Sequence, residues 1–181
     1  MSKKKIAIIT GANSGLGKEF LKLLNDEKDI TEVWAIARNK ERLDQLVVKK
    51  GSNIVNIASQ ASFQPLPYQN IYSSTKAFVR NYTRALNVEL KDKGINAIAV
   101  CPGWMITGLI DRGVIGAEKG TNNFTGMVTP DLVAKKALKD AKKNKDISVY
   151  GIYTKSSHLL AKLLPQKMMM QVWLKQQHIK K

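Results

Sequence analysis

The sequence predicts an α/β fold in which a doubly wound parallel sheet carries helices on both faces. Three observations lead to this prediction. Short apolar segments rich in β-branched residues recur at residues 5–10, 32–37, 53–59 and 95–101. They lack polar alternation, as expected of strands that are buried on both faces. Segments with the apolar spacing of amphipathic helices follow them along the chain.

The first strand, Lys5 to Thr10, ends in a glycine-rich turn that runs to Gly17. After the turn, Leu16, Phe20 and Leu24 repeat with helical spacing. Glycines between a strand and a helix let the backbone approach a phosphate, and the helix N-terminus presents free N–H groups at the positive end of its dipole. We therefore expect the turn to bind the pyrophosphate of a dinucleotide, with a bare structural turn as the alternative.

The second strand, Glu32 to Ala37, is followed directly by Arg38. At this place an acidic residue would hydrogen-bond a ribose 2′-hydroxyl, whereas a guanidinium suits a 2′-phosphate. Arg38 therefore favours NADP(H) over NAD(H). A surface arginine without a ligand is the alternative.

An amphipathic helix from Lys40 to Lys50 leads into the third strand, which ends at Ser59. Ligands of open α/β sheets bind at the carboxyl ends of strands, where Ser59 is placed. Tyr72 and Lys76 then lie one turn apart on the same face of a predicted helix. An ammonium close to a phenol favours the phenolate, which can exchange a proton with a substrate. A solvated helix face is the alternative for this pair.

The helix that begins at Tyr72 is predicted to end near Gly94, with its apolar face formed by Phe78, Tyr82, Leu86 and Leu90. A buried strand then ends at Cys101 and is followed by Pro102-Gly103. The segment from Trp104 to Met127 is predicted to be a mobile loop that covers a ligand. Thr129 and Pro130 begin a further helix.

We divide the chain into a dinucleotide-binding and catalytic domain, residues 1–155, and a basic amphipathic tail, residues 156–181. The tail contains lysines but no acidic residue, and two helix-like pieces flank Pro165. Such a tail can pack on the domain, cover a substrate pocket or contact a membrane surface weakly. Packing on the domain is the interpretation that we favour.

The formal net charge of +16 raises the question of a polyanionic partner. The lysines are spread over helical segments without interleaved arginines and aromatics, so solvated faces are favoured and nucleic acid is not expected as a partner. No apolar run reaches the roughly 18 residues of a membrane span, and no signal cleavage site follows Met1. We expect a cytoplasmic protein. His158 and His178 lack metal-ligand spacing, so no metal is expected, and Cys101 is predicted to be a buried thiol.

Four motifs together resemble the classical short-chain dehydrogenase/reductase family. Thr10-Gly11-x-x-x-Gly15-x-Gly17 is similar to its cofactor loop, and Tyr72-x-x-x-Lys76 is similar to its catalytic pair. Ser59 matches its catalytic serine, and Pro102-Gly103-x-x-x-Thr107 matches the turn on the nicotinamide side. The resemblance implies a Rossmann-like sheet and an oxidoreductase that transfers hydride between a nicotinamide cofactor and a carbonyl or alcohol. Arg38 favours NADP(H) as that cofactor, and the Met-rich tail, which can line the pocket, suggests a small apolar substrate.

The resemblance also implies roles. Tyr72 exchanges the proton at the substrate oxygen, Ser59 hydrogen-bonds that oxygen, and Lys76 favours the phenolate and holds the nicotinamide ribose. The implied cofactor-binding residues are Thr10, Gly11, Asn13, Ser14, Gly15, Leu16, Gly17, Arg38, Tyr72, Lys76, Pro102, Gly103 and Thr107.

The chain departs from the family between Arg38 and Ser59, where a single helix replaces two further strand-helix units. The sheet is therefore expected to be reduced by about two such units, one of them carrying a strand between the glycine-turn strand and the Ser59 strand. The flanking strands must then come together or leave backbone groups unpaired. We expect weak or absent turnover. A non-catalytic nucleotide-binding or interaction module and a basic peripheral-membrane protein remain alternatives, and a homo-oligomer is left open.

Overall fold

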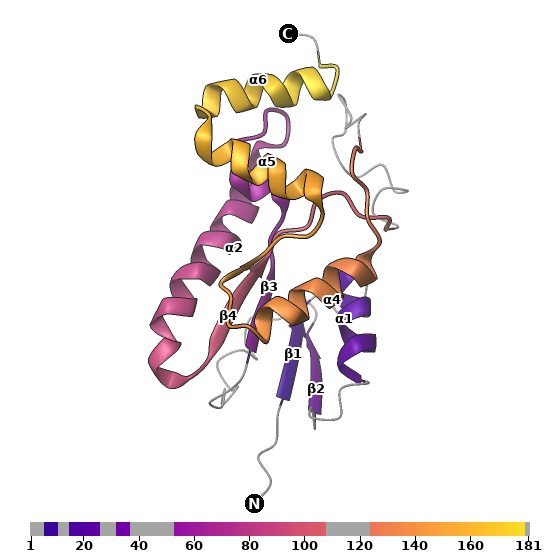
Figure 1. Ribbon diagram of the computed structural model, residues 1–181, viewed down its shortest axis with the longest axis vertical. Helices are drawn as coiled ribbons and strands as arrows, with labels where there is room; N and C mark the ends of the chain where they lie inside the picture. Colours follow the sequence, from indigo (N-terminus) through magenta and orange to yellow (C-terminus); the bar gives the residue numbers. More distant parts are fainter. Residues whose placement is uncertain (1–5, 11–14, 26–31, 37–52, 108–123, 180–181) are drawn as a thin grey trace, which may run out of the picture.

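Parallel strands and helices alternate along the chain in the computed structural model, which describes residues 6–10, 15–25, 32–36, 53–107 and 124–179 (Figure 1). The strands are β1 (Ile6–Thr10), β2 (Glu32–Ile36), β3 (Asn53–Ile57), β4 (Asn96–Val100) and β5 (Ile147–Ser148). The helices are α1 (Gly15–Asn25), α2 (Asn70–Glu89), α4 (Pro130–Ala141), α5 (Ile152–Leu163) and α6 (Gln166–Gln176), with short 3-10 helices η2 (Gln60–Phe63) and η3 (Lys91–Lys93). This alternation with a parallel sheet confirms the predicted α/β fold.

The described strands form two parallel sheets. β1 pairs with β2, and β3 pairs with β4, which in turn pairs with β5. β1 lies next to β3, but no ladder joins the two strands in the described part of the chain. This division between the described sheets falls where the sequence predicts that a strand is missing.

Helices cover both faces of β4, whose five residues are all buried. Val100 packs with the apolar faces of α1 and α4, including Phe20 and Val133. Ala99 and Cys101 point to the opposite face, where Val79 of α2 packs. This alternation along one strand explains why its sequence is continuously apolar.

α2 ends at Glu89 with Leu90 as its C-cap, before the predicted stop at Gly94. Gly94, in the left-handed conformation (φ 66°), instead ends the 3-10 helix η3 that follows. The apolar face predicted for this helix is wrong at Phe78 and Tyr82, which are 70% and 54% exposed. The buried face instead carries Ser73 and the fully buried Thr83, whose hydroxyl accepts a hydrogen bond from Asn56 Nδ2 at 2.9 Å. Hydrogen-bonded polar residues therefore lie beside the apolar Val79 at this helix-sheet contact.

The segment predicted as a covering loop is anchored at both described ends. Ile106 N donates to the Val128 carbonyl and Val128 N to the Trp104 carbonyl, both at 3.0 Å, around a parallel bridge between Met105 and Val128. Its residues 108–123 lie outside the described residues, as does the helix predicted for residues 40–50.

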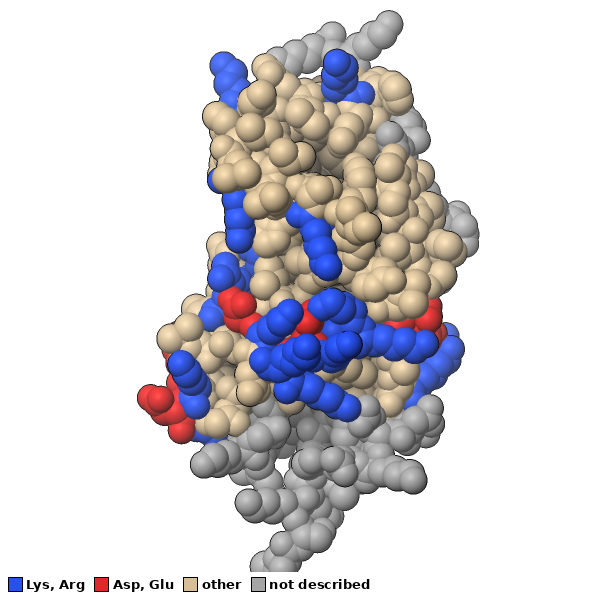
Figure 2. Space-filling view, in the orientation of Figure 1, with Lys and Arg blue, Asp and Glu red and all other residues tan. Residues whose placement is uncertain are grey.

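α5 and α6 lie together beyond the carboxyl ends of β3 and β4 (Figure 1). α5 begins at Ile152, so the predicted boundary at residue 155 falls inside a helix. Figure 2 shows basic side chains gathered over α4, which carries Lys135, Lys136 and Lys139. Within the described helices, none is long and apolar enough to cross a membrane.

Candidate active site

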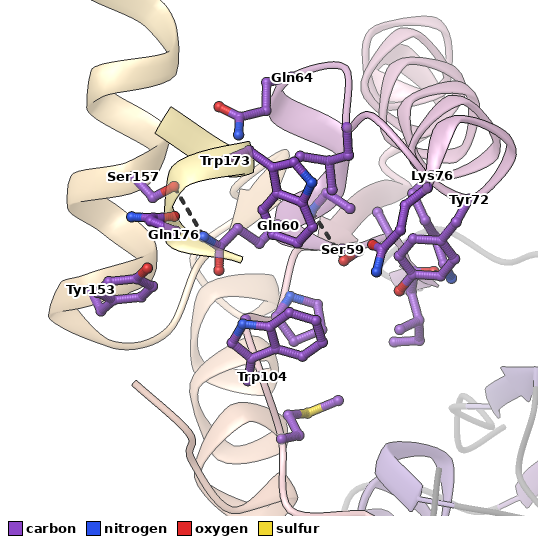
Figure 3. Close-up of a pocket in the computed structure, with 18 of the residues that line it drawn as sticks. Ser59, Gln60, Gln64, Tyr72, Lys76, Trp104, Tyr153, Ser157, Trp173 and Gln176 are labelled. Carbon is purple, nitrogen blue, oxygen red and sulfur yellow. Dashed lines mark hydrogen bonds between the residues drawn. The ribbon is translucent and has the colours of Figure 1, made fainter. Parts of the chain in front are cut away.

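A cavity of about 680 Å³ opens at the carboxyl ends of the strands, bounded by η2, the start of α2, the segment after β4, and helices α5 and α6 (Figure 3). It brings together most of the residues predicted from the sequence. The predicted residues that line it are Gly15, Leu16, Gly17, Ser59, Tyr72, Lys76, Pro102, Gly103 and Thr107. These predicted residues lie up to 92 positions apart in the sequence, from Gly15 to Thr107, and the fold brings them to one site.

The remaining predicted residues belong to the part of the chain whose side chains the structure does not describe. Thr10 is the last residue of β1, which runs toward the glycine turn. Gly11, Asn13, Ser14 and Arg38 lie outside the described residues.

The N-terminus of α1 forms one wall of the cavity. Gly15 has a left-handed conformation (φ 48°), which favours glycine, and the Thr107 side chain lies beside it. The first turn of α1 contains no acidic residue, and the first N–H groups of a helix have no partner within that helix. These features fit an anionic group such as a pyrophosphate.

Ser59 lies two residues after β3 and caps η2. Its Oγ accepts a hydrogen bond of 3.1 Å from Ala61 N, and the residue is 9% exposed. A hydroxyl that accepts one hydrogen bond still has its own proton to donate. The Ser59 hydroxyl is therefore held in place with a donor available at the cavity wall.

Tyr72 and Lys76 lie in the first two turns of α2, as their spacing predicts. Lys76 Nζ is 5.9 Å from the centroid of the Tyr72 ring. Burial lowers the pKa of Lys76, and its ammonium donates a hydrogen bond of 3.0 Å to the Ile57 carbonyl. The Tyr72 side chain is 43% exposed at the cavity mouth. The pair thus places a phenol beside a fixed cation.

The turn after β4 brings three elements close together. Pro102 O accepts a hydrogen bond of 2.8 Å from Gln60 N. A Cβ atom on Gly103 would clash with Thr154 Oγ1 of α5 and lie 2.9 Å from Gln60 Oε1. Glycine is required here by close approach, and the turn fixes α5 against η2.

Among the lining residues that were not predicted individually from the sequence, Figure 3 labels Gln60, Gln64, Trp104, Tyr153, Ser157, Trp173 and Gln176. Gln60 Nε2 donates to Ser157 Oγ at 3.0 Å, and Trp173 Nε1 donates to the Pro67 carbonyl at 3.1 Å. α5 and α6 therefore both pack on the domain and cover the cavity, two of the three roles considered for the tail. The sequence signal for Trp104, Ser157, Trp173 and Gln176 was their place in the two segments predicted to cover a ligand, the loop that begins at Trp104 and the tail of residues 156–181.

The sequence resembles known proteins over part of its length. The profile of the family described as short chain dehydrogenase matches residues 43–113. The ketoacyl reductase HetN of Nostoc sp. is 32% identical over 123 residues, which cover 67% of this chain and 41% of that protein. The chain thus spans less than half of the length of the curated relatives that it matches first.

Solved structures share the fold. A short chain dehydrogenase from Burkholderia cenocepacia J2315 in complex with NADP has a TM-score of 0.69 at 15% identity, covering 98% of this chain and 99% of that one. A short chain dehydrogenase/reductase from Burkholderia phymatum in complex with NAD has a TM-score of 0.65 at 14% identity, covering 88% and 93%. At these identities the likeness shows the fold alone.

Proposed function

This chain belongs to the short-chain dehydrogenase/reductase family, and from that premise we propose that it transfers hydride between a nicotinamide cofactor and a carbonyl or alcohol substrate. One observation carries the proposal. Ser59, Tyr72 and Lys76 line the same cavity as the N-terminus of α1. A proton-transfer group and an anion-binding helix end thus face one space.

Tyr72 acts at the substrate oxygen in this proposal. Its hydroxyl donates a proton when a carbonyl is reduced and accepts one when an alcohol is oxidised. The Lys76 ammonium beside the ring stabilises the phenolate form. Ser59, whose Oγ is held by Ala61 N, donates a hydrogen bond to the same oxygen and stabilises the charge that develops there.

The cofactor-binding part of the proposal assigns the pyrophosphate to Gly15, Leu16 and Gly17 and the ribose to Lys76. A bound nicotinamide would supply or accept the hydride. We propose NADP(H) in preference to NAD(H) because Arg38 follows the second strand and its guanidinium suits a 2′-phosphate. The neighbour from Burkholderia cenocepacia holds NADP and the one from Burkholderia phymatum holds NAD, so this preference depends on Arg38.

The substrate is proposed to be a small apolar carbonyl or alcohol. Apolar side chains line the part of the cavity near α5 and α6, namely Trp104, Leu160, Met169, Val172 and Trp173. The two helices also exclude water from the reacting groups.

We expect turnover to be slow relative to the family. The glycine turn follows β1, whereas Ser59 follows β3, and no ladder joins these strands in the described chain. Small displacements between a cofactor site and an acid/base pair reduce rates strongly.

The test is a titration of the purified chain with NADPH and NADH, followed by NADPH oxidation with an apolar ketone. Tyr72→Phe should abolish oxidation and retain NADPH binding. Tyr82→Phe is the matched control, since Tyr82 lies on the same helix, is 54% exposed and does not line the cavity. NADPH binding without oxidation by the unmodified chain would favour a non-catalytic nucleotide-binding module. Absence of NADPH binding would overturn the proposed function.

A further inference from the structure

The side of α5 that faces the domain is polar. Thr154 is buried there, and Ser157 Oγ accepts a hydrogen bond of 3.0 Å from Gln60 Nε2. The His158 ring on the same side stacks on Phe63, with 3.9 Å between the ring centroids. Hydrogen bonds and ring stacking therefore attach α5 to the domain, in place of the apolar contacts that usually hold an amphipathic helix on a core.

The opposite side of α5 is apolar and faces outward. Ile152, Leu159 and Leu163 are 88%, 57% and 70% exposed. At about 100° per residue along a helix, these three residues fall on one side, which we call the outer face of α5. An exposed set of large apolar side chains on one helix face marks a surface that binds a partner.

The charge around the outer face has one sign. Lys155 and Lys162 are exposed on α5 and lie together along one flank of this face. The sequence from Ile147 to Lys181 contains no acidic residue. In Figure 2 the upper part of the molecule, where α5 and α6 lie, shows basic but no acidic side chains. The partner of the outer face is therefore expected to be apolar and negatively charged.

An anionic bilayer surface has both properties. Leucines on one side of a helix and lysines beside them are typical of helices that lie in a membrane interface, where the lysine stems cover apolar surface and the ammonium groups reach the lipid headgroups. With 12 residues α5 is too short to cross the bilayer, so it would lie along the surface. A second copy of this chain is disfavoured as the partner, because it would bring the same lysines against each other.

We propose that the outer face of α5 docks this protein on an anionic membrane surface. Leu159 and Leu163 insert among the lipids, and Lys155 and Lys162 contact the headgroups. This docking requires neither a cofactor nor turnover and goes beyond the proposed function.

The cavity opens beside the outer face. Leu160, which follows Leu159 on α5, and Val172 of α6 both line the cavity and are 47% and 38% exposed, so they lie at its rim. A docked molecule would present this rim to the lipid. Resting on the proposed function, the consequence is that an apolar ketone dissolved in the bilayer enters the cavity without crossing bulk water.

The test is sedimentation of the purified chain with sucrose-loaded vesicles, without nucleotide and at several salt concentrations. Vesicles of phosphatidylcholine alone are compared with vesicles of equimolar phosphatidylcholine and phosphatidylserine. The chain should bind the anionic vesicles about tenfold or more tightly than the neutral ones, and the binding should weaken as salt is raised.

Point variants of exposed residues separate the outer face from general attraction of a basic protein. Leu163→Ser should weaken binding to anionic vesicles by about tenfold or more, because apolar area that inserts is lost. Val88→Ser is the matched control, since Val88 is 72% exposed in the last turn of α2, at the end away from α5 (Figure 1), and binding should not change. Lys162→Gln should weaken binding about fivefold, and Lys93→Gln in η3 should weaken it less. All four variants should keep the melting temperature of the unmodified chain, because the replaced side chains are exposed.

The competing occupant is tested by sedimentation velocity without lipid. A dimer that Leu163→Ser dissociates, in a chain that binds no vesicles, would assign the outer face to a second copy and overturn the docking. Equal binding of anionic vesicles by Leu163→Ser and the unmodified chain, an equal loss in Val88→Ser, or no binding to either vesicle would also overturn it.

The outcomes separate this inference from the proposed function. Vesicle binding that Leu163→Ser weakens and Val88→Ser retains, without NADPH oxidation, would support the docking and count against the proposed reaction. NADPH oxidation by a chain that binds no vesicles would support the reaction and overturn the docking.

Discussion

Lys76 Nζ donates a hydrogen bond of 3.0 Å to the carbonyl of Ile57, the last residue of β3. In a parallel ladder successive residues point their backbone groups to opposite sides. Ala58 N donates to Val100 O of β4, so the Ile57 carbonyl faces the free edge of β3. The Lys76 ammonium therefore satisfies a backbone carbonyl at the edge of β3 where the described sheet divides. This hydrogen bond holds the ammonium 5.9 Å from the centre of the Tyr72 ring.

Replacement of Lys76 by methionine should lower kcat for NADPH-dependent ketone reduction by about 100-fold or more, because the charge that stabilises the phenolate is lost. The measurement is steady-state kinetics as a function of pH. The matched control is Lys93→Met, since Lys93 is exposed in η3 and does not line the cavity. Equal losses in both variants would show that Lys76 has no particular role.

Gly103→Ala should destabilise the protein by about 1–3 kcal/mol, because the added methyl group clashes with Thr154 Oγ1 and Gln60 Oε1. The Gln60 amide is the end of a flexible side chain, so Thr154 is the harder obstacle. Urea unfolding of Gly103→Ala, Thr154→Ala and the double variant forms a double-mutant cycle. Gly103→Ala should lower the free energy of unfolding by less in the Thr154→Ala background than in the unmodified chain. If the effects of the two substitutions are simply additive, Gly103 and Thr154 are not in contact.

The predicted site residues that the structure brings together share a local signature. Ser59 was identified by its place at a strand end, and Tyr72 with Lys76 by the pitch of a helix, so neither required knowledge of distant contacts. Ala61 of η2 and Trp173 of α6 pack together only because α6 folds back on η2, more than 100 residues away in the sequence. No spacing rule encodes such a contact.

The buried face of α2 shows a second limit of prediction from sequence. Phe78 and Tyr82 are apolar residues four positions apart, a spacing that indicates a core face. The sheet instead contacts the face of Thr83, because Asn56 of β3 donates a hydrogen bond to its hydroxyl. A polar pair that is satisfied by a partner strand cannot be recognised before the partner is known.

Cys101 should make the stability of the protein fall at alkaline pH. Burial raises the pKa of its thiol from 9.0 to about 11. Because the pKa is higher in the folded state, the protonated thiol contributes fully to the free energy of unfolding below pH 9, where the thiol is protonated in both the folded and the unfolded chain. This contribution is lost as pH rises from about 9 to about 11, because the unfolded chain ionises first.

The loss assigned to Cys101 is about 2–3 kcal/mol over this interval. It is measured by urea unfolding at several pH values for the unmodified chain and for Cys101→Ala. The difference between the two slopes of unfolding free energy against pH isolates the contribution of the thiol from that of lysines and tyrosines. Parallel pH dependences in the two proteins would contradict the assignment.

Trp173 should be the residue that holds α6 over the cavity. It is 8% exposed, packs with Ala61 and Leu66, and donates through Nε1 to the Pro67 carbonyl at 3.1 Å. Trp173→Ala removes both the packing and the hydrogen bond and should cost about 3–5 kcal/mol in the free energy of unfolding. Trp173→Phe keeps most of the packing and should cost about 1 kcal/mol through the lost hydrogen bond.

The same two variants test whether α6 contributes to substrate binding. If α6 excludes water and contacts an apolar substrate, Trp173→Ala should raise KM for an apolar ketone more than it changes the affinity for NADPH, because Trp173 belongs to α6 and not to the α1 wall that is proposed to hold the cofactor. Trp173→Phe should raise KM much less. A KM unchanged in Trp173→Ala, measured at a temperature where the variant is folded, would mean that α6 packs on the domain without taking part in the site.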